Sequence, residues 1–142
     1  MGPAEAVGLR AVLDTNVLVS ALRFEGVCTE LTVLWQHQRF TPVVSSEILE
    51  EYARVLAYAK FHLTEAEIQV FIEEDFLPYA EVVRVTHVPR AVPADSSDDK
   101  FLACAVAGHA THVVSGDTHL LALGRHRGIP ILTPRQFLNL LS

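Results

Sequence analysis

The chain has 142 residues, and at roughly 100–200 residues per domain this length predicts one domain spanning residues 1–142. Apolar residues make up 50% of the chain and charged residues 20%, which is typical of a folded protein and not of a disordered one. The 17 acidic and 11 basic residues give a formal net charge of -6, which argues against holding duplex nucleic acid by bulk electrostatics. We therefore expect the acidic surplus either to face water or to gather around a cation.

The cysteines and the apolar stretches bear on where the protein works. Cys28 and Cys104 lie far apart and have no partner at CxxC spacing, so the sequence predicts neither a disulfide framework nor a zinc ribbon. No stretch approaches the roughly 20 apolar residues that span a bilayer, and residues 1–9 lack the apolar core of a signal peptide. We expect a cytoplasmic protein without a membrane partner, with both cysteines buried and residues 1–9 forming a loosely ordered extension.

Short runs rich in valine or isoleucine alternate along the chain with longer segments of helical periodicity. The predicted strands are Ala11–Leu13, Pro42–Val44, Val82–Val85, His112–Val114 and Ile129–Leu132. The predicted helices are Val17–Leu22, Thr29–His37, Ser46–Ala57, Glu65–Phe76, Asp98–Ala107, Thr118–Gly124 and Pro134–Leu141. Thr86–Ser97, with two prolines and several polar residues, is a long connection. This alternation predicts an α/β fold, in which helices cover both faces of a short parallel sheet of about five strands.

Acidic residues follow several of the predicted strands. Asp14 ends the first strand and Asp117 follows the fourth. A further group, Asp95, Asp98 and Asp99, lies at the start of the helix after the long connection. In open parallel sheets ligands bind outside the carboxyl ends of the strands, because side chains that follow several strands meet there. The sequence therefore predicts carboxylates from three separate segments at one edge of the sheet.

A fourth carboxylate comes from the helix predicted over Ser46–Ala57. The apolar stripe of this helix consists of Ile48, Leu49, Tyr52, Val55 and Leu56. Glu51 lies about 100° from the centre of the stripe, whereas Glu47 and Glu50 lie roughly 140–160° away. A carboxylate at the margin of the core is partly desolvated and needs a pairing partner or a metal. We therefore select Glu51 and expect Glu47 and Glu50 to face water.

The same geometry applied to Asp98–Ala107 leaves two aspartates open. The apolar stripe of this helix consists of Phe101, Leu102, Ala105 and Val106. Asp99 lies beside the stripe, whereas Asp98 lies nearer its middle. Asp98 is also suited to cap the helix, a role for which Ser97 competes. We favour Asp99 as the functional carboxylate and keep Asp98 as the alternative.

Converging carboxylates with no basic residue among them repel one another unless cations lie between them. The predicted set is Asp14, Glu51, Asp99 and Asp117. Hard oxygen ligands of this kind suit Mg²⁺ or Mn²⁺ better than Zn²⁺. One or two such ions can activate a water and stabilise the attacking and leaving oxygens of a phosphodiester. The carboxylates therefore favour a nuclease.

Three segments of the chain are informative together: AVLDTNVLVSAL, VVSSEILEEYARVL and DSSDDKFLACAVAGHATHVVSGDTHLLAL. They resemble the PIN domains, and in particular the small prokaryotic toxin-like group related to VapC. The resemblance extends from Ala11 to about Phe137. It implies a single-domain, three-layer fold and a metal-dependent endoribonuclease that cuts single-stranded RNA, the toxin of a type II toxin–antitoxin system. It also implies a small antitoxin protein as a partner, and a homodimer.

The catalytic and metal-binding residues that the resemblance implies, position by position, are Asp14, Glu51, Asp99 and Asp117. The run of aspartates also permits Asp98 in place of Asp99. Asn16 matches the polar position two residues after the first aspartate, and Ser115 stands where the family commonly has threonine and keeps a hydroxyl. We expect these two residues and Thr15 to help to order the site.

Structural interpretations compete with these functional ones. Asp14 or Asn16 can simply cap the following helix. Glu51 can form a surface ion pair with Arg54, three positions further on. The histidines show no HExxH spacing, so we expect no zinc site. The acidic run Glu73–Asp75 is expected to face water.

Two other functions remain open. One is a PIN-like module that binds RNA or a protein and cuts little, against which the four intact carboxylates argue. The other is a phosphatase or receiver fold with aspartates at strand ends and Mg²⁺, against which the unpaired Asp14 in DTN argues. Arg23, Lys100 and His119 lie near the predicted site in sequence, so we treat them as candidate contacts to the substrate.

Overall fold

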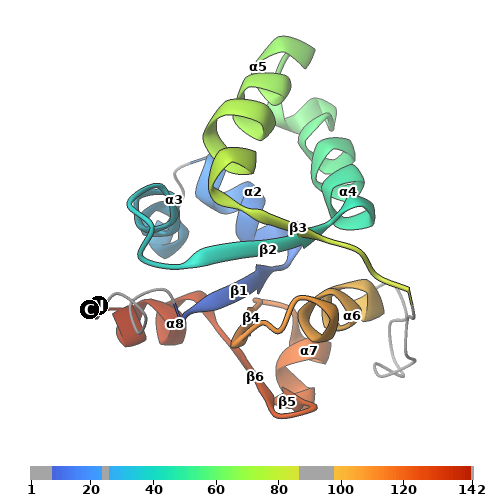
Figure 1. Ribbon diagram of the computed structural model, residues 1–142. Coiled ribbons are helices and arrows are strands. Elements are labelled where there is room, and N and C mark those ends of the chain that lie inside the picture. Colours follow the sequence, from blue (N-terminus) through green and yellow to red (C-terminus); the bar gives the residue numbers. More distant parts are fainter. Residues whose placement is uncertain (1–7, 24–25, 87–97, 142) are drawn as a thin grey trace.

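The computed structural model describes residues 8–23, 26–86 and 98–141 (Figure 1). The strands are β1 (Arg10–Leu13), β2 (Thr41–Ser45), β3 (Glu81–Val83), β4 (His112–Val114), β5 (Arg125–His126) and β6 (Ile129–Leu132). The α-helices are α2 (Thr15–Leu22), α3 (Thr29–Gln36), α4 (Ser46–Leu56), α5 (Glu65–Val70), α6 (Asp99–Ala107), α7 (Thr118–Leu123) and α8 (Pro134–Leu141). Most of the expected extension (residues 1–7) and of the long connection (residues 87–97, with Asp95 and Ser97) lies outside the described residues.

The strands form one sheet in the order β3-β2-β1-β4-β6-β5, parallel except for the β5–β6 pair. The predicted α/β class and parallel sheet are confirmed. The sheet also has a sixth strand, β5, which the sequence does not predict. Two residues are too few to show a strand pattern. Pairing with Val43–Ser45 of β2 limits β3 to Glu81–Val83, so this strand begins and ends earlier than expected.

The helix expected over Glu65–Phe76 divides into two parts. It is α-helical through Val70, and Phe71–Phe76 forms a π-helical turn. Within this turn the carbonyl of Asp75 accepts a hydrogen bond of 3.0 Å from the indole Nε1 of Trp35. Hydrophobic periodicity predicts a helical face but does not distinguish such a wider turn from an α-helix.

Helices cover both faces of the sheet and give the expected three layers (Figure 1). The helices α2, α3, α4 and α5 lie on one side of the sheet, and α6 and α7 lie on the other. The last helix, α8, contacts β6 and the 3₁₀ turn Gly26–Cys28. Among the described residues, no helix combines the length and the apolar composition that crossing a membrane requires.

Aromatic side chains in edge-to-face contact join distant segments in the core. The ring centroids of Trp35 and Phe76 are 5.4 Å apart, and those of Tyr52 and Phe76 are 5.8 Å apart. Tyr52 is buried on α4, and its hydroxyl donates a 2.5 Å hydrogen bond to the carbonyl of Leu13 at the end of β1. This contact fixes α4 against β1 and thereby brings the neighbouring Glu51 close to the residue that follows the strand.

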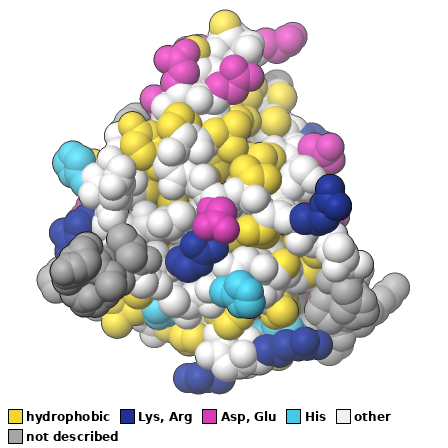
Figure 2. Space-filling view, in the orientation of Figure 1, with side chains coloured by type: hydrophobic (Ala, Val, Ile, Leu, Met, Phe, Trp, Pro, Cys, Tyr) yellow, Lys and Arg dark blue, Asp and Glu magenta, His cyan; other side chains and the backbone are white. Residues whose placement is uncertain are grey.

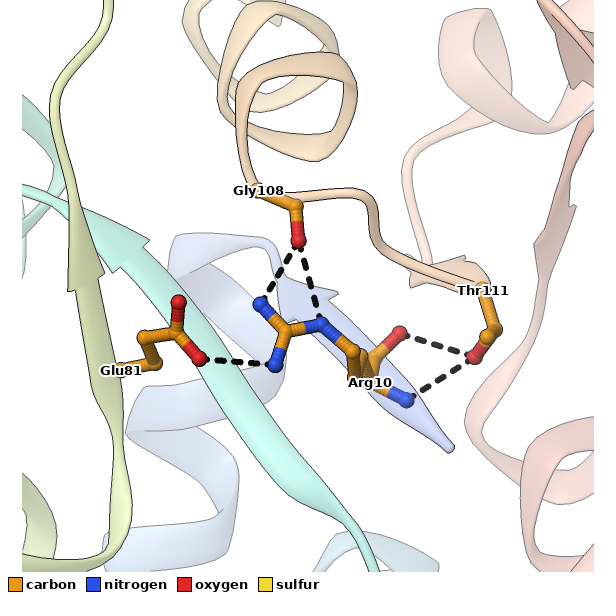
Figure 3. Close-up of polar contacts among 4 residues, drawn as sticks. All are labelled: Arg10, Glu81, Gly108 and Thr111. Atoms are coloured by element: carbon orange, nitrogen blue, oxygen red, sulfur yellow. Dashed lines mark hydrogen bonds and ion pairs between the residues drawn. The ribbon is translucent and has the colours of Figure 1, made fainter. Parts of the chain in front are cut away.

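Where the central strands begin, Arg10 joins three elements (Figure 3). Its Nε and Nη2 donate to the carbonyl of Gly108 at 3.1 and 2.7 Å, and its Nη1 donates to Oε1 of Glu81 at 2.7 Å. The hydroxyl of Thr111 accepts from the backbone N–H of Arg10 and donates to its carbonyl, both at 2.9 Å. A Cβ at position 108 would lie 2.5 Å from Cγ1 of Val43, so this close approach requires glycine. These contacts fasten β1, β3 and the end of α6 together.

Part of the acidic surplus lies on the surface of α5 and of the π-helical turn that follows it. Figure 2 shows several acidic side chains gathered over α5 at the top of the visible face, whereas most of the lysine and arginine side chains lie lower on it. In the π-helical turn, Glu73 and Glu74 are exposed and Asp75 is half-buried. For the first two of these residues the prediction of a solvated acidic run is confirmed.

Candidate metal centre

The path of the chain through the sheet reverses between β1 and β4. From β1 the chain proceeds outward to β2 and β3, and from β4 it proceeds outward to β6 and β5 on the other side. Such a switch point opens a crevice at the carboxyl ends of the two central strands. Asp14 follows β1 directly, and Asp117 follows β4 after two residues. Both aspartates cap the helices that begin at this crevice.

Several carboxylates line the crevice, and Asp14 is the most deeply buried of them, with 5% of its surface exposed. It accepts a 2.9 Å hydrogen bond from the backbone N–H of Val17 and a second hydrogen bond from the hydroxyl of Ser115. The Ser115 Oγ also accepts from the backbone N–H of Asp117 at 2.9 Å, so one hydroxyl links the two acidic loops. Burial raises the pKa of Asp14, the charge of Asp117 adds to this increase, and the hydrogen bonds only partly oppose it.

Glu51 reaches the same crevice from α4, and its side chain is 16% exposed. Its Oε1 accepts a 2.6 Å hydrogen bond from Nζ of Lys100, and its Oε2 accepts one from the hydroxyl of Thr15. Burial alone would raise the pKa of Glu51, but the hydrogen bonds from Lys100 and Thr15 outweigh burial and lower it. Unlike Asp14, Glu51 is therefore already neutralised by a neighbouring cation.

The other glutamates of α4 behave as the helix geometry predicts. Glu47 and Glu50 are exposed, whereas Glu51 borders the core. The ion pair expected between Glu51 and Arg54 is present as well, with Oε1 and Nη2 3.6 Å apart. Because the side chain of Arg54 is 63% exposed, this pair contributes little beside the contact with Lys100.

Of the two adjacent aspartates, Asp98 lines the crevice and Asp99 does not. Asp99 is 3% exposed, and its charge acts on His126. Burial and the charge of Arg127 lower the pKa of His126, and Asp99 partly opposes this. The structure thus places the alternative residue, Asp98, on the crevice in place of the favoured Asp99. Asp98 immediately precedes α6 and Asp99 begins it, so tertiary packing, and not the helical periodicity used above, decides which of the two reaches the crevice.

The crevice encloses a cavity of about 310 Å³, within the size of small-ligand pockets. The expected site residues on its wall are Asp14, Thr15, Asn16, Glu51, Asp98 and Asp117. They come from four segments that are far apart in the sequence. Ser115 lies behind this wall, fully buried, and holds Asp14 and the loop of Asp117 together.

Sequence reasoning missed the outer wall of the cavity, which includes Tyr58, Lys60 and Phe61. Val55 follows Glu51 by four residues on α4, so helical spacing places it beside the carboxylate, but Tyr58 lies beyond the end of this helix. Lys60 and Phe61 lie in a 3₁₀ turn, η2 (Ala59–Phe61), where periodicity carries no signal.

The three candidate substrate contacts have different surroundings. The guanidinium of Arg23 lies 4.8 Å from the centroid of the Phe61 ring, close to the outer wall. Lys100 contacts Glu51, as described above, and its side chain is 12% exposed. His119 is exposed on α7 and is not part of the cavity wall.

Both cysteines are buried and free, as predicted. Burial raises the pKa of both thiols, that of Cys104 to about 12. A thiolate nucleophile is therefore not formed at neutral pH at either position.

The donor set of the cavity fits a hard divalent cation such as Mg²⁺ or Mn²⁺. Its ligating atoms are carboxylate oxygens, and the buried Asp14 has only neutral hydrogen-bond partners among the described residues. In the described ranges no three acidic, histidine or cysteine side chains are yet drawn together closely enough to hold a metal ion. Lys100 already contacts Glu51, so a cation has to compete with its ammonium group for that carboxylate.

Comparison with known families agrees with this geometry. The family model of the PIN domain matches residues 10–119, which include all four carboxylates of the cavity. No curated protein matches the chain significantly. PIN domains are generally nucleases, so the match supports a nuclease-type function. Because it covers more than half of the sequence, the chain belongs to the PIN-domain family.

Proposed function

We propose that the chain is a Mg²⁺- or Mn²⁺-dependent endoribonuclease that hydrolyses phosphodiester bonds of single-stranded RNA. The observation that carries this proposal is the convergence of four carboxylates from separate segments on one small cavity. They are Asp14, Glu51, Asp98 and Asp117. The match to the PIN-domain family supports a nuclease-type function. We propose Asp98 in place of Asp99 because Asp98 is the one of the two that lines the cavity.

The residues around the carboxylates have distinct tasks in this proposal. Asp14, Glu51, Asp98 and Asp117 would hold one or two ions, which would supply charge stabilisation for the phosphodiester and acidify the attacking water. Ser115 keeps Asp14 and Asp117 in a fixed relation through its two hydrogen bonds. The hydroxyl of Thr15 orients one oxygen of Glu51, and Lys100 holds the other. Asn16 is also part of the cavity wall.

Cleavage of a labelled single-stranded RNA in Mn²⁺ tests the proposal. Replacing a ligand removes several kcal/mol of transition-state stabilisation, so we expect Glu51→Gln and Asp14→Asn to cut at least about 100-fold more slowly. Glu50→Gln, on the same helix but exposed, is the matched control and should cut at the wild-type rate. Equal cleavage by all four proteins would sink the proposal.

A second candidate, a PIN-like module that binds RNA or a protein and cuts little, is favoured by one observation. Glu51 is already paired with Lys100, which weakens its availability as a ligand. Titration calorimetry with Mn²⁺ separates the two candidates. Binding in the millimolar range or tighter supports the nuclease, and its absence supports the binding module.

The remaining parts of the proposal rest on the resemblance to toxin-like PIN domains. We propose a toxin of a type II toxin–antitoxin system, acting in the cytoplasm as a homodimer and neutralised by a small antitoxin protein. Induced expression should then arrest growth, and Asp14→Asn should abolish the arrest. Growth arrest by both proteins would show that toxicity, if any, does not come from this site.

A further inference from the structure

The outer wall of the cavity combines an aromatic ring with positive charge, next to carboxylates. Tyr58, Lys60 and Phe61 line the mouth, and Arg23 lies beside them over the Phe61 ring. This grouping is unexpected in a chain with a net charge of -6. No part of the metal-binding role described above requires it.

The ring of Tyr58 is available for stacking. Its residue is 48% exposed, although it lines the cavity. Among the described residues it forms no contact with another aromatic ring and lies under no cation. Its position is nevertheless fixed, because its backbone N–H donates a 3.0 Å hydrogen bond to the carbonyl of Val55 at the end of α4.

The ring of Phe61 is not available for stacking in the same way, because two cationic side chains already lie over it. Nζ of Lys60 lies 5.2 Å and Cζ of Arg23 lies 4.8 Å from its ring centroid. Cation–π contacts of this kind hold the two positive charges at the mouth of the cavity. The mouth therefore attracts anionic groups, while the carboxylates deeper inside repel them unless a metal ion is bound.

The end of α4 connects these features to the carboxylates. Glu51 lies five residues before Leu56, the last residue of α4, which at 1.5 Å per residue is roughly 7–8 Å along the helix axis, and Tyr58 follows the end of this helix by two residues. A phosphate held near the carboxylates thus leaves room for an adjacent nucleotide to reach the ring. Proteins that bind single strands use this combination of aromatic platforms and backbone-contacting cations.

We infer that the mouth is a subsite for one unpaired nucleobase of a single-stranded nucleic acid. The base stacks on the ring of Tyr58, and Lys60 and Arg23 contact the phosphates beside it. This inference rests on the proposed function for the identity of the neighbouring phosphate. It adds a base-binding element that selects single strands, since a base held in a duplex cannot reach the ring.

Fluorescence anisotropy with a labelled single-stranded RNA of about ten nucleotides measures this subsite directly. The Asp14→Asn background prevents cutting during the measurement. In that background, Tyr58→Ala should weaken binding about tenfold, and Tyr58→Phe should retain it. Leu140→Ala is the matched control. Leu140 is also a large exposed hydrophobic residue, but it lies on α8 and is not part of the cavity wall, so its removal should leave binding unchanged. Duplex RNA should bind equally with and without the Tyr58 ring.

Tyr58→Trp provides a second, spectroscopic readout. The chain's single tryptophan, Trp35, is fully buried, so the introduced indole is the one exposed to RNA. We expect its fluorescence to be quenched by single-stranded RNA and to change little when the bases are replaced by abasic sites.

The outcomes separate this inference from the proposed function. Tyr58-dependent binding without any cleavage in Mn²⁺ would refute the nuclease and keep the subsite. Cleavage with an unchanged KM in Tyr58→Ala would keep the nuclease and refute the subsite. Equal binding by the proteins with Tyr58 and with Tyr58→Ala, no binding by either, or an unquenched indole would overturn the inference.

Discussion

The two ends of the central strands each hold a short contact between a cation and a glutamate. Where the strands begin, Arg10 contacts Glu81 at 2.7 Å, with side chains 24% and 51% exposed. Where they end, Lys100 contacts Glu51 at 2.6 Å, with side chains 12% and 16% exposed. The two distances are nearly equal, but the surroundings of the two pairs are opposite.

At the beginning of the strands the charges are balanced. Arg10 also donates to the carbonyl of Gly108, and its hydrogen bond lowers the pKa of Glu81. At the carboxyl ends of the strands carboxylates are in excess, and burial raises the pKa of Asp14. Functional sites commonly retain such locally unfavourable charge, and the rest of the fold has to stabilise it. We therefore expect substitutions at the two ends to affect stability and activity differently.

The largest effect on stability is expected at Arg10. Arg10→Met removes charged donors from the buried carbonyl of Gly108 and from Glu81, so the free energy of unfolding should fall by about 2 kcal/mol. Urea denaturation measures this loss. Below the unfolding transition, RNA cleavage per folded molecule should remain at the wild-type level. A large loss of cleavage in folded Arg10→Met would show that the two ends are coupled.

Lys100→Met tests the other pair. Without metal, Glu51 loses its nearest cation while staying mostly buried, and the free energy of unfolding should fall by about 1.5 kcal/mol. Mn²⁺ no longer competes with the ammonium group, so saturating Mn²⁺ should raise the melting temperature more in this variant than in the wild type. An equal Mn²⁺-induced shift in both proteins would contradict competition at Glu51.

Asp14→Asn should act in the opposite direction. Asparagine keeps the cap of α2 but carries no charge, so the metal-free protein should be stabilised by about 1 kcal/mol at neutral pH. Thermal melting in EDTA measures the gain, and added Mn²⁺ should reduce the difference from the wild type. A destabilised Asp14→Asn protein would mean that the hydrogen bonds of Asp14 outweigh the burial of its charge.

Much of this arrangement was predictable from the sequence, because it depends on local periodicity. The position of Glu51 beside an apolar stripe identified it among three glutamates of one helix, and the structure agrees. Asp14 and Asp117 were found because they follow strands, which the parallel topology brings to one edge. The alternation of strands and helices also predicted the sheet and its covering layers.

The remaining features depend on contacts that periodicity does not encode. Lys100 reaches Glu51 across 49 positions, and nothing in either helix pattern pairs them. Tertiary packing sets the orientation of the start of α6, and this orientation decides which of Asp98 and Asp99 lines the cavity. Lys60 and Phe61 lie in a short turn, so their place at the cavity mouth became visible only in three dimensions.

The smallest expected effect concerns Glu81 and its dependence on pH. Arg10 lowers the pKa of Glu81 in the folded protein below its ordinary value of 4.5, so the contact stabilises the fold fully above that pH. The stabilisation is lost as pH falls through the lowered folded pKa. Since Glu81 is half-exposed, Glu81→Gln should lower the free energy of unfolding by about 0.5 kcal/mol at neutral pH. In urea denaturation the difference should therefore shrink as the pH falls from 4.5 through the lowered pKa of Glu81 in the folded protein. Glu50→Gln replaces an exposed glutamate of α4 and is the control, which should leave the free energy of unfolding unchanged at neutral pH. A difference that does not shrink in acid would assign the effect of Glu81→Gln to packing of the side chain at the edge of the sheet.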